Sequence, residues 1–100
     1  MIIVIAEAQA TVEAADELAV LLARTAAASR GDTGCQDYRF YRDTEDPTRF
    51  ASVERWDSKA DLDAHMAAAH TQALLGALPG KVAGAPVITV HEVSDSRPYS

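Results

Sequence analysis

The chain is short of cysteine and of basic side chains, and each shortage excludes a class of protein. Its single cysteine, Cys35, can form no internal disulfide, a usage typical of cytosolic proteins. Lys and Arg number 9 against 15 Asp and Glu, which gives a net charge of −6, and the basic residues are scattered along the chain. Because nucleic acids and anionic membranes bind positively charged surfaces, we expect neither as a partner.

Long apolar runs and the common cofactor motifs are also missing. Only six apolar residues precede Glu7, with no basic region, so we expect neither a signal peptide nor a membrane span, and a cytoplasmic protein. The chain has no glycine-rich phosphate loop and no Gly-x-Gly-x-x-Gly stretch, which argues against a bound nucleotide. It has no Cys/His cluster and no Asp-rich loop, so we expect neither a metal nor any other cofactor.

Periodic patterns of apolar residues predict four strands and two helical segments. We predict strands at residues 2–8, 35–43, 49–56 and 87–93. The first helix is predicted at residues 12–30, with Thr11 as its N-cap and Gly31 as its stop. The second helical segment begins after the N-cap Ser58, bends near the alanines that follow His65, and ends at Leu78.

This β-α-β-β-α-β order is the split arrangement of ferredoxin-like α+β proteins, in which helices cover one face of a four-stranded antiparallel sheet. A chain of 100 residues forms one domain, which we place at residues 1–94, with a polar tail at residues 95–100. The first strand is apolar on both faces, and the second adds aromatic residues to each. Because an uncovered apolar face usually marks a subunit interface, we expect a homodimer through the open sheet face, a dimeric α+β barrel.

The junction between the third strand and the second helical segment concentrates the side chains that can do chemistry. The strand ends with Glu54 and with Trp56, the only tryptophan of the chain. On the helix that follows, His65 shares one face with apolar residues, which are Leu62, Met66 and Ala69. An imidazole titrates near neutral pH and suits a general base, so His65 is the strongest catalytic candidate. The alternative is a structural histidine that hydrogen-bonds the end of the strand.

Several short sequences in this region resemble the antibiotic biosynthesis monooxygenase family, and the resemblance extends from about residue 3 to residue 92. They are Gly34-Cys35 with Tyr38, Asp46-Pro47 with Phe50, Glu54-Arg55-Trp56, and Leu62-Asp63-Ala64-His65 followed by His70. The resemblance implies a small dimeric protein with a ferredoxin-like fold. It also implies a cofactor-independent monooxygenase that oxidises a quinol, an anthrone or a similar aromatic polyphenol with O₂.

The family also contains haem-degrading enzymes, and the residues of this chain argue against that branch. Those enzymes pair an Asn on the first strand with a Trp and a more distal His on the helical segment. Here the first strand offers Glu7 and Ala8, the Trp position is taken by His65, and the distal His position falls near Leu75. Two further functions stay open: an isomerase in which His65 moves a proton between carbons of a small metabolite, and a non-enzymatic dimeric ligand-binding protein.

For the oxygenase, the resemblance implies that His65 removes a phenolic proton from the substrate. The resulting phenolate is electron-rich enough to pass an electron to O₂ without flavin or metal. His70 lies five residues after His65, which puts the two side chains about 140° apart on an ideal helix. We therefore predict that these two histidines do not share a metal ion.

The remaining site candidates are aromatic residues and one acid. Four aromatic side chains could form the walls of a pocket for a planar substrate, or belong to the core or the dimer interface: Trp56, Tyr38, Phe40 and Tyr41. Glu54 could orient His65 or bind a substrate hydroxyl. Its alternative role is an ion pair with an arginine of a neighbouring strand, Arg55, Arg39 or Arg42.

Overall fold

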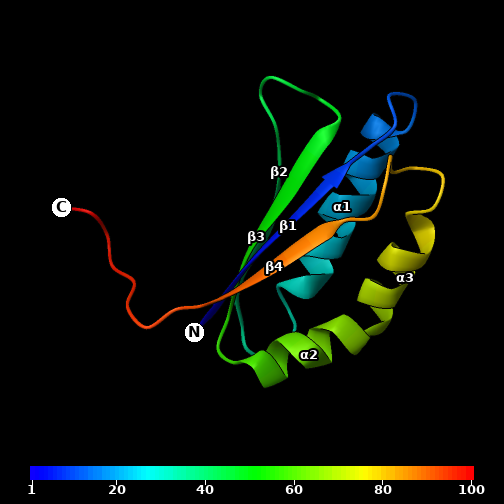
Figure 1. Cartoon of the computed structure of the whole chain (residues 1–100). Helices are drawn as coiled ribbons and strands as arrows, with labels where there is room; N and C mark the ends of the chain where they lie inside the picture. Colours follow the sequence, from blue (N-terminus) through cyan, green and yellow to red (C-terminus); the bar gives the residue numbers. More distant parts are fainter.

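Strands β1 (Ile2–Gln9) and β3 (Arg49–Trp56) form the centre of an antiparallel sheet in this computed structural model, which describes all 100 residues. Strand β2 (Cys35–Arg42) pairs with β3, and β4 (Val87–Glu92) pairs with β1, which gives the order β2-β3-β1-β4. The helices are α1 (Ala15–Ser29), α2 (Lys59–Ala67) and α3 (Ala69–Ala77) (Figure 1). The predicted ferredoxin-like α+β fold is confirmed.

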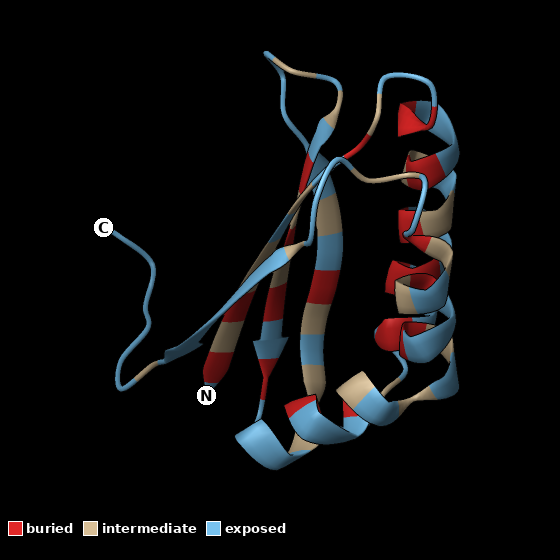
Figure 2. Ribbon diagram, turned by 45° about the vertical axis from the view of Figure 1, so that its right-hand side comes forward, coloured by how far each residue is buried: buried red, intermediate tan, exposed pale blue.

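The inner face of the sheet is set by the alternation of residues on β3. Phe50, Ser52, Glu54 and Trp56 are all buried, and the residues between them are half-buried or exposed. The register places alternate residues of β1 opposite these four, so both central strands turn the same face toward the helices. Figure 2 shows all helices on one side of the sheet, with buried residues facing the space between the layers.

Helix α1 packs on this face through a stripe of buried residues at helical spacing, which are Leu18, Leu22, Ala26 and Ser29. The helix starts three residues later than predicted. Residues 12–14 form a turn instead, and the Ala14 amide donates a hydrogen bond to Oγ1 of Thr11 at 3.2 Å. Thr11 therefore caps the turn that leads into α1, which accounts for the shifted boundary.

A single extended residue, Ala68, separates α2 from α3. Its backbone angles are φ −65° and ψ 149°, so the chain turns sharply between the two helices (Figure 1). The break frees the carbonyl of Met66, and the side-chain amide of Gln72 donates a hydrogen bond to it at 2.7 Å. This contact satisfies a polar group that a continuous helix would have paired internally. The predicted bend near the alanines is thus a complete interruption.

The outer face of the sheet has no helix over it and carries apolar side chains. Ile3, Ile5 and Val53 are half-buried there, while Tyr41 of β2 and Val87 of β4 are exposed. Residues 95–100 form no helix or strand, and Figure 1 shows this end of the chain leading away from the sheet. None of the helices is both long and apolar enough to cross a membrane.

Candidate active site

A cavity of about 270 Å³ lies between the inner face of the sheet and helices α2 and α3, and we name it the sheet–helix cavity. Its lining is mostly apolar and includes four of the predicted site residues, Tyr38, Phe40, Glu54 and His65. A larger and more open hollow of about 420 Å³ lies near the β2–β3 turn, but no histidine lines it. The sheet–helix cavity therefore holds the residues with candidate chemistry.

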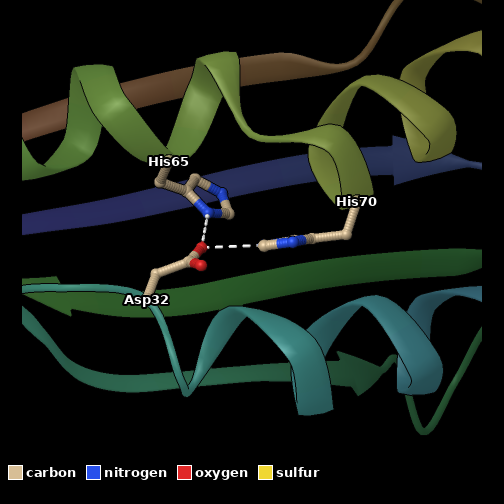
Figure 3. A group of neighbouring side chains, drawn as sticks. All are labelled: Asp32, His65 and His70. Carbon is tan, nitrogen blue, oxygen red and sulfur yellow. Dashed lines mark hydrogen bonds and ion pairs between the residues drawn. The ribbon is translucent and has the colours of Figure 1, made fainter.

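His65 lies in the last turn of α2 and is almost completely buried. Its Nδ1 atom is 2.8 Å from Oδ2 of Asp32, in the loop between α1 and β2 (Figure 3). Backbone hydrogen bonds fix that loop: the Asp32 amide donates to the carbonyl of Ser29, and the Cys35 amide donates to the carbonyl of Asp32. The hydroxyl of Thr71 lies 3.3 Å from the same ring nitrogen.

This contact determines which nitrogen of His65 is available for chemistry. A carboxylate accepts hydrogen bonds only, so the neutral ring carries its proton on Nδ1 and leaves Nε2 as an acceptor. The two nitrogens of an imidazole point to opposite sides of the ring, so Nε2 is turned away from Asp32. Because His65 also lines the sheet–helix cavity, this arrangement can accept a proton from a bound hydroxyl group.

His70, in the first turn of α3, meets the same carboxylate. Its Nε2 atom lies 2.8 Å from Oδ2 of Asp32, so one oxygen interacts with both imidazoles (Figure 3). The expectation that His65 and His70 point far apart is wrong, because it assumed one continuous helix and the chain is broken at Ala68. The ligand atoms of the two histidines and Asp32 all lie within 4.8 Å of one another, so a shared cation is no longer excluded.

The four aromatic candidates have different positions. Tyr38 and Phe40 line the sheet–helix cavity, and their rings meet edge to face at a centroid distance of 5.6 Å. Trp56 does not line it: the indole is fully buried, with its ring centroid 4.6 Å from that of His65. Tyr41 faces the other side of the sheet and is 55% exposed. Trp56 thus supports the imidazole, and Tyr41 contributes to the outer face.

Glu54 is buried and bonded to its neighbours on the same strand. One carboxylate oxygen accepts from Oγ of Ser52 at 2.6 Å, and the other accepts from Nε1 of Trp56 at 3.0 Å. Burial raises the pKa of Glu54 above its usual value, while these hydrogen bonds and the nearby His65 act in the opposite direction. The alternative ion pair with an arginine does not form.

Two further groups near the cavity titrate well outside the neutral range. Burial raises the pKa of the Tyr38 hydroxyl, so this group is a protonated donor or acceptor at neutral pH. Burial and the neighbouring Asp32 raise the pKa of the Cys35 thiol to about 11, and the side chain is half-buried. Since the thiolate is the nucleophilic form, Cys35 is not suited to covalent catalysis.

The fold and the site now define the class of protein. The antibiotic biosynthesis monooxygenase family model matches residues 1–76, and the chain belongs to this family. Among solved structures, it is similar to a candidate antibiotic biosynthesis monooxygenase from Deinococcus radiodurans, with 28% identity and a TM-score of 0.93 over 100% of this chain and 99% of that one. Among curated proteins, no sequence matches.

Two more distant structures share the fold. The protein Rv0793 from Mycobacterium tuberculosis is 23% identical, with a TM-score of 0.90 over 97% of this chain and 98% of that chain. The protein PA3566 from Pseudomonas aeruginosa is also 23% identical, with a TM-score of 0.87 over 94% of each chain. At these identities the similarity is one of architecture, so the chemistry must be argued from the site itself.

Proposed function

We propose that this protein is a cofactor-independent monooxygenase that oxidises a quinol, an anthrone or a similar aromatic polyphenol with O₂. The observation that carries this proposal is the pair formed by His65 and Asp32 at the wall of a mostly apolar cavity. The pair supplies an oriented base with a free nitrogen, and family membership makes oxygenation the favoured reaction class. The cavity volume of about 270 Å³ favours a compact substrate.

In this mechanism the substrate hydroxyl lies against Nε2 of His65 and gives up its proton there. The imidazolium that forms is stabilised by Asp32, whose carboxylate already accepts the Nδ1 proton at 2.8 Å. The mostly apolar lining disfavours water beside the anion, which favours its reaction with O₂ over simple reprotonation. Tyr38 and Phe40 supply aromatic surface against which a planar ring can pack.

The reaction balances without an external reductant. The phenolate transfers one electron to O₂, and recombination forms a carbon–oxygen bond at the activated carbon. Loss of water then leaves one oxygen atom in the product as a carbonyl and releases the other as H₂O. All four electrons come from the substrate, as when the CH₂ group of an anthrone becomes C=O. The protein therefore needs to supply only binding, a base and a dry environment.

We also propose that two copies of the chain form a homodimer through the outer face of the sheet. The argument is the apolar character of that face, which includes Ile3, Ile5, Val53 and Tyr41 and has no helix over it. An isolated small domain gains stability when such a surface is covered by a second copy. The proposed dimer leaves the sheet–helix cavity on the opposite face free for substrate.

The test is oxygen consumption by metal-free and flavin-free protein with a panel of hydroquinones and anthrones. Uptake above the autoxidation blank that falls about 10²–10⁴-fold in His65→Ala supports the proposal. His91→Ala is the matched control, because it removes an imidazole from the outer face of β4, on the side of the sheet away from the cavity. Equal uptake in wild type and His65→Ala would overturn the assigned base. Turnover without O₂ uptake would indicate the isomerase. The absence of turnover with every substrate would indicate the ligand-binding protein.

A further inference from the structure

The proposed oxygenase mechanism gives no role to His70, although its position is specific. Two imidazoles from different helices converge on one carboxylate oxygen, each at 2.8 Å. The three side chains come from the loop after α1, the end of α2 and the start of α3, and they meet only because Ala68 interrupts the helix (Figure 3). If Asp32 served only to orient His65, its contact with His70 would not be needed.

We propose that Asp32, His65 and His70 form a binding site for a divalent transition-metal cation such as Zn²⁺. Two imidazoles and one carboxylate are a donor set that first-row divalent cations bind in proteins. The three ligand atoms already lie within 4.8 Å of one another. Bonds of about 2.0–2.2 Å to a tetrahedral ion place ligand atoms about 3.3–3.6 Å apart. The carboxylate therefore has to withdraw from each imidazole by about 0.5–0.8 Å, and the two ring nitrogens have to approach one another by up to about 1.5 Å.

The local structure allows both that adjustment and access from solvent. The side chain of His65 is 2% exposed, whereas those of Asp32 and His70 are 20% and 29% exposed. A cation can therefore reach the site from the side of Asp32 and His70 without passing through the sheet–helix cavity. His65 is held in place by buried neighbours, including Trp56 and Tyr38, so the more exposed pair can adjust around it. Three protein ligands also leave one position for water.

Cation binding changes the tautomer of His65. In the cation-free protein the Nδ1 proton of the neutral ring faces Asp32, and Nε2 is a free acceptor. A cation at Nδ1 replaces that proton, so the neutral ring carries its proton on Nε2 instead. His70 exchanges tautomers in the reverse sense, since its Nε2 atom becomes the ligand. The Nε2 nitrogen of His65, which is turned away from Asp32, thus becomes a donor, and a bound cation inhibits any reaction that needs this nitrogen as a base.

The proposed cation site is argued from geometry alone, whereas inhibition by the cation depends on the proposed oxygenase function. The direct test is therefore titration of chelator-treated protein with Zn²⁺ by calorimetry, and with Co²⁺ by visible absorption. We expect one ion per chain for wild type, and weakening of at least about 100-fold in His70→Gln. Glutamine retains an N–H group that can donate to Asp32 but lacks the imidazole ligand, so the variant separates metal binding from local packing. His91→Ala is the control and is expected to bind like wild type.

Several results would overturn the site. These are the absence of saturable binding by wild type, equal binding by wild type and His70→Gln, and loss of binding in His91→Ala. Thermal melts of each variant without metal check that the fold is intact. Ring ¹⁵N chemical shifts of His65 provide a second measurement, because the proton is expected to move from Nδ1 to Nε2 on addition of Zn²⁺. Zn²⁺ binding by a protein whose metal-free form shows no O₂ uptake would support the cation site and count against the oxygenase, so the two proposals can fail separately.

Discussion

The Nδ1 atom of His65 lies 2.8 Å from Oδ2 of Asp32, although 33 positions separate the two residues. This contact leaves Nε2 as the ring nitrogen that can accept a proton. Asp32→Asn places an amide opposite Nδ1, and an amide that donates to this nitrogen holds the proton on Nε2. We expect a fall in kcat/KM of about 10²–10⁴-fold for O₂ uptake, comparable to that of His65→Ala.

The matched control for this substitution is Asp16→Asn on α1, whose carboxylate is exposed and pairs with Arg42 at 3.0 Å. It makes the same chemical change far from the cavity, and its activity is expected to equal that of wild type. Full activity in Asp32→Asn, with both variants folded, would show that Asp32 does not orient the base. The measurement is steady-state oxygen uptake at a fixed pH with a substrate that wild type turns over.

Asp32 and His70 show where sequence patterns stop being informative. Strand alternation predicted β3, and helical spacing placed His65 among apolar residues, because both patterns are local. The contact with Asp32 is non-local, and no local pattern singles out this residue next to the helix stop Gly31. The break at Ala68 has no proline or glycine at that position to announce it, so the direction of His70 could not be predicted from periodicity.

Two of the three aromatic residues of β2 that were predicted as pocket walls line the cavity, and local pattern again could not distinguish them from the third. In the structure this strand has a register shift between Cys35 and Asp37. A shift of one residue exchanges the two faces of a strand, so the pattern alone could not say which aromatic residues point inward. In the folded chain Tyr38 and Phe40 face the cavity, and Tyr41 faces away from it.

Glu54 makes stability depend on pH. Burial raises its pKa in the folded chain above the unfolded value, so the folded state binds this proton more readily. The associated stability is fully present below the unfolded pKa of about 4.3 and is lost as pH rises through the folded pKa. Glu54→Gln removes this loss while its amide can keep bonds to Ser52 and Trp56. We expect the variant to gain stability relative to wild type as pH rises.

Urea unfolding at about pH 4 and about pH 8 measures this effect. The difference in unfolding free energy between Glu54→Gln and wild type is expected to be larger at the higher pH. Glu45→Gln is the control, because Glu45 is exposed in the turn between β2 and β3 and should give the same small difference at both values. A larger benefit of Glu54→Gln at the lower pH would contradict the sign of the argument.

Two features disfavour any side chain at Gly34: its backbone conformation and the neighbouring Asp61. Its φ of 76° lies in the left-handed region, and a Cβ there would lie 2.1 Å from Oδ2 of Asp61. We expect Gly34→Ala to cost about 1–3 kcal/mol in urea unfolding. In an Asp61→Ala background the contacts with Oδ2 and Cγ disappear, while the contact with Cβ of residue 61 at 2.6 Å and the backbone strain persist, so the cost should fall only in part. Gly76→Ala is the opposite control: nothing lies within 4 Å of a Cβ in α3, and we expect a gain of about 0.8–1.0 kcal/mol.

Val53 lies near the middle of the outer sheet face, opposite Ile5 of β1 and Arg39 of β2. A two-fold symmetric interface on this face would contain the residue twice, so Val53→Asp introduces two carboxylates. If each costs about 1.4 kcal/mol, the dissociation constant of the dimer rises about 100-fold, which sedimentation velocity over a range of concentrations measures. Val20→Asp on the exposed side of α1 is the matched control and is expected to retain the wild-type mass. Dissociation by Val20→Asp and not by Val53→Asp would place the interface on the helical side instead.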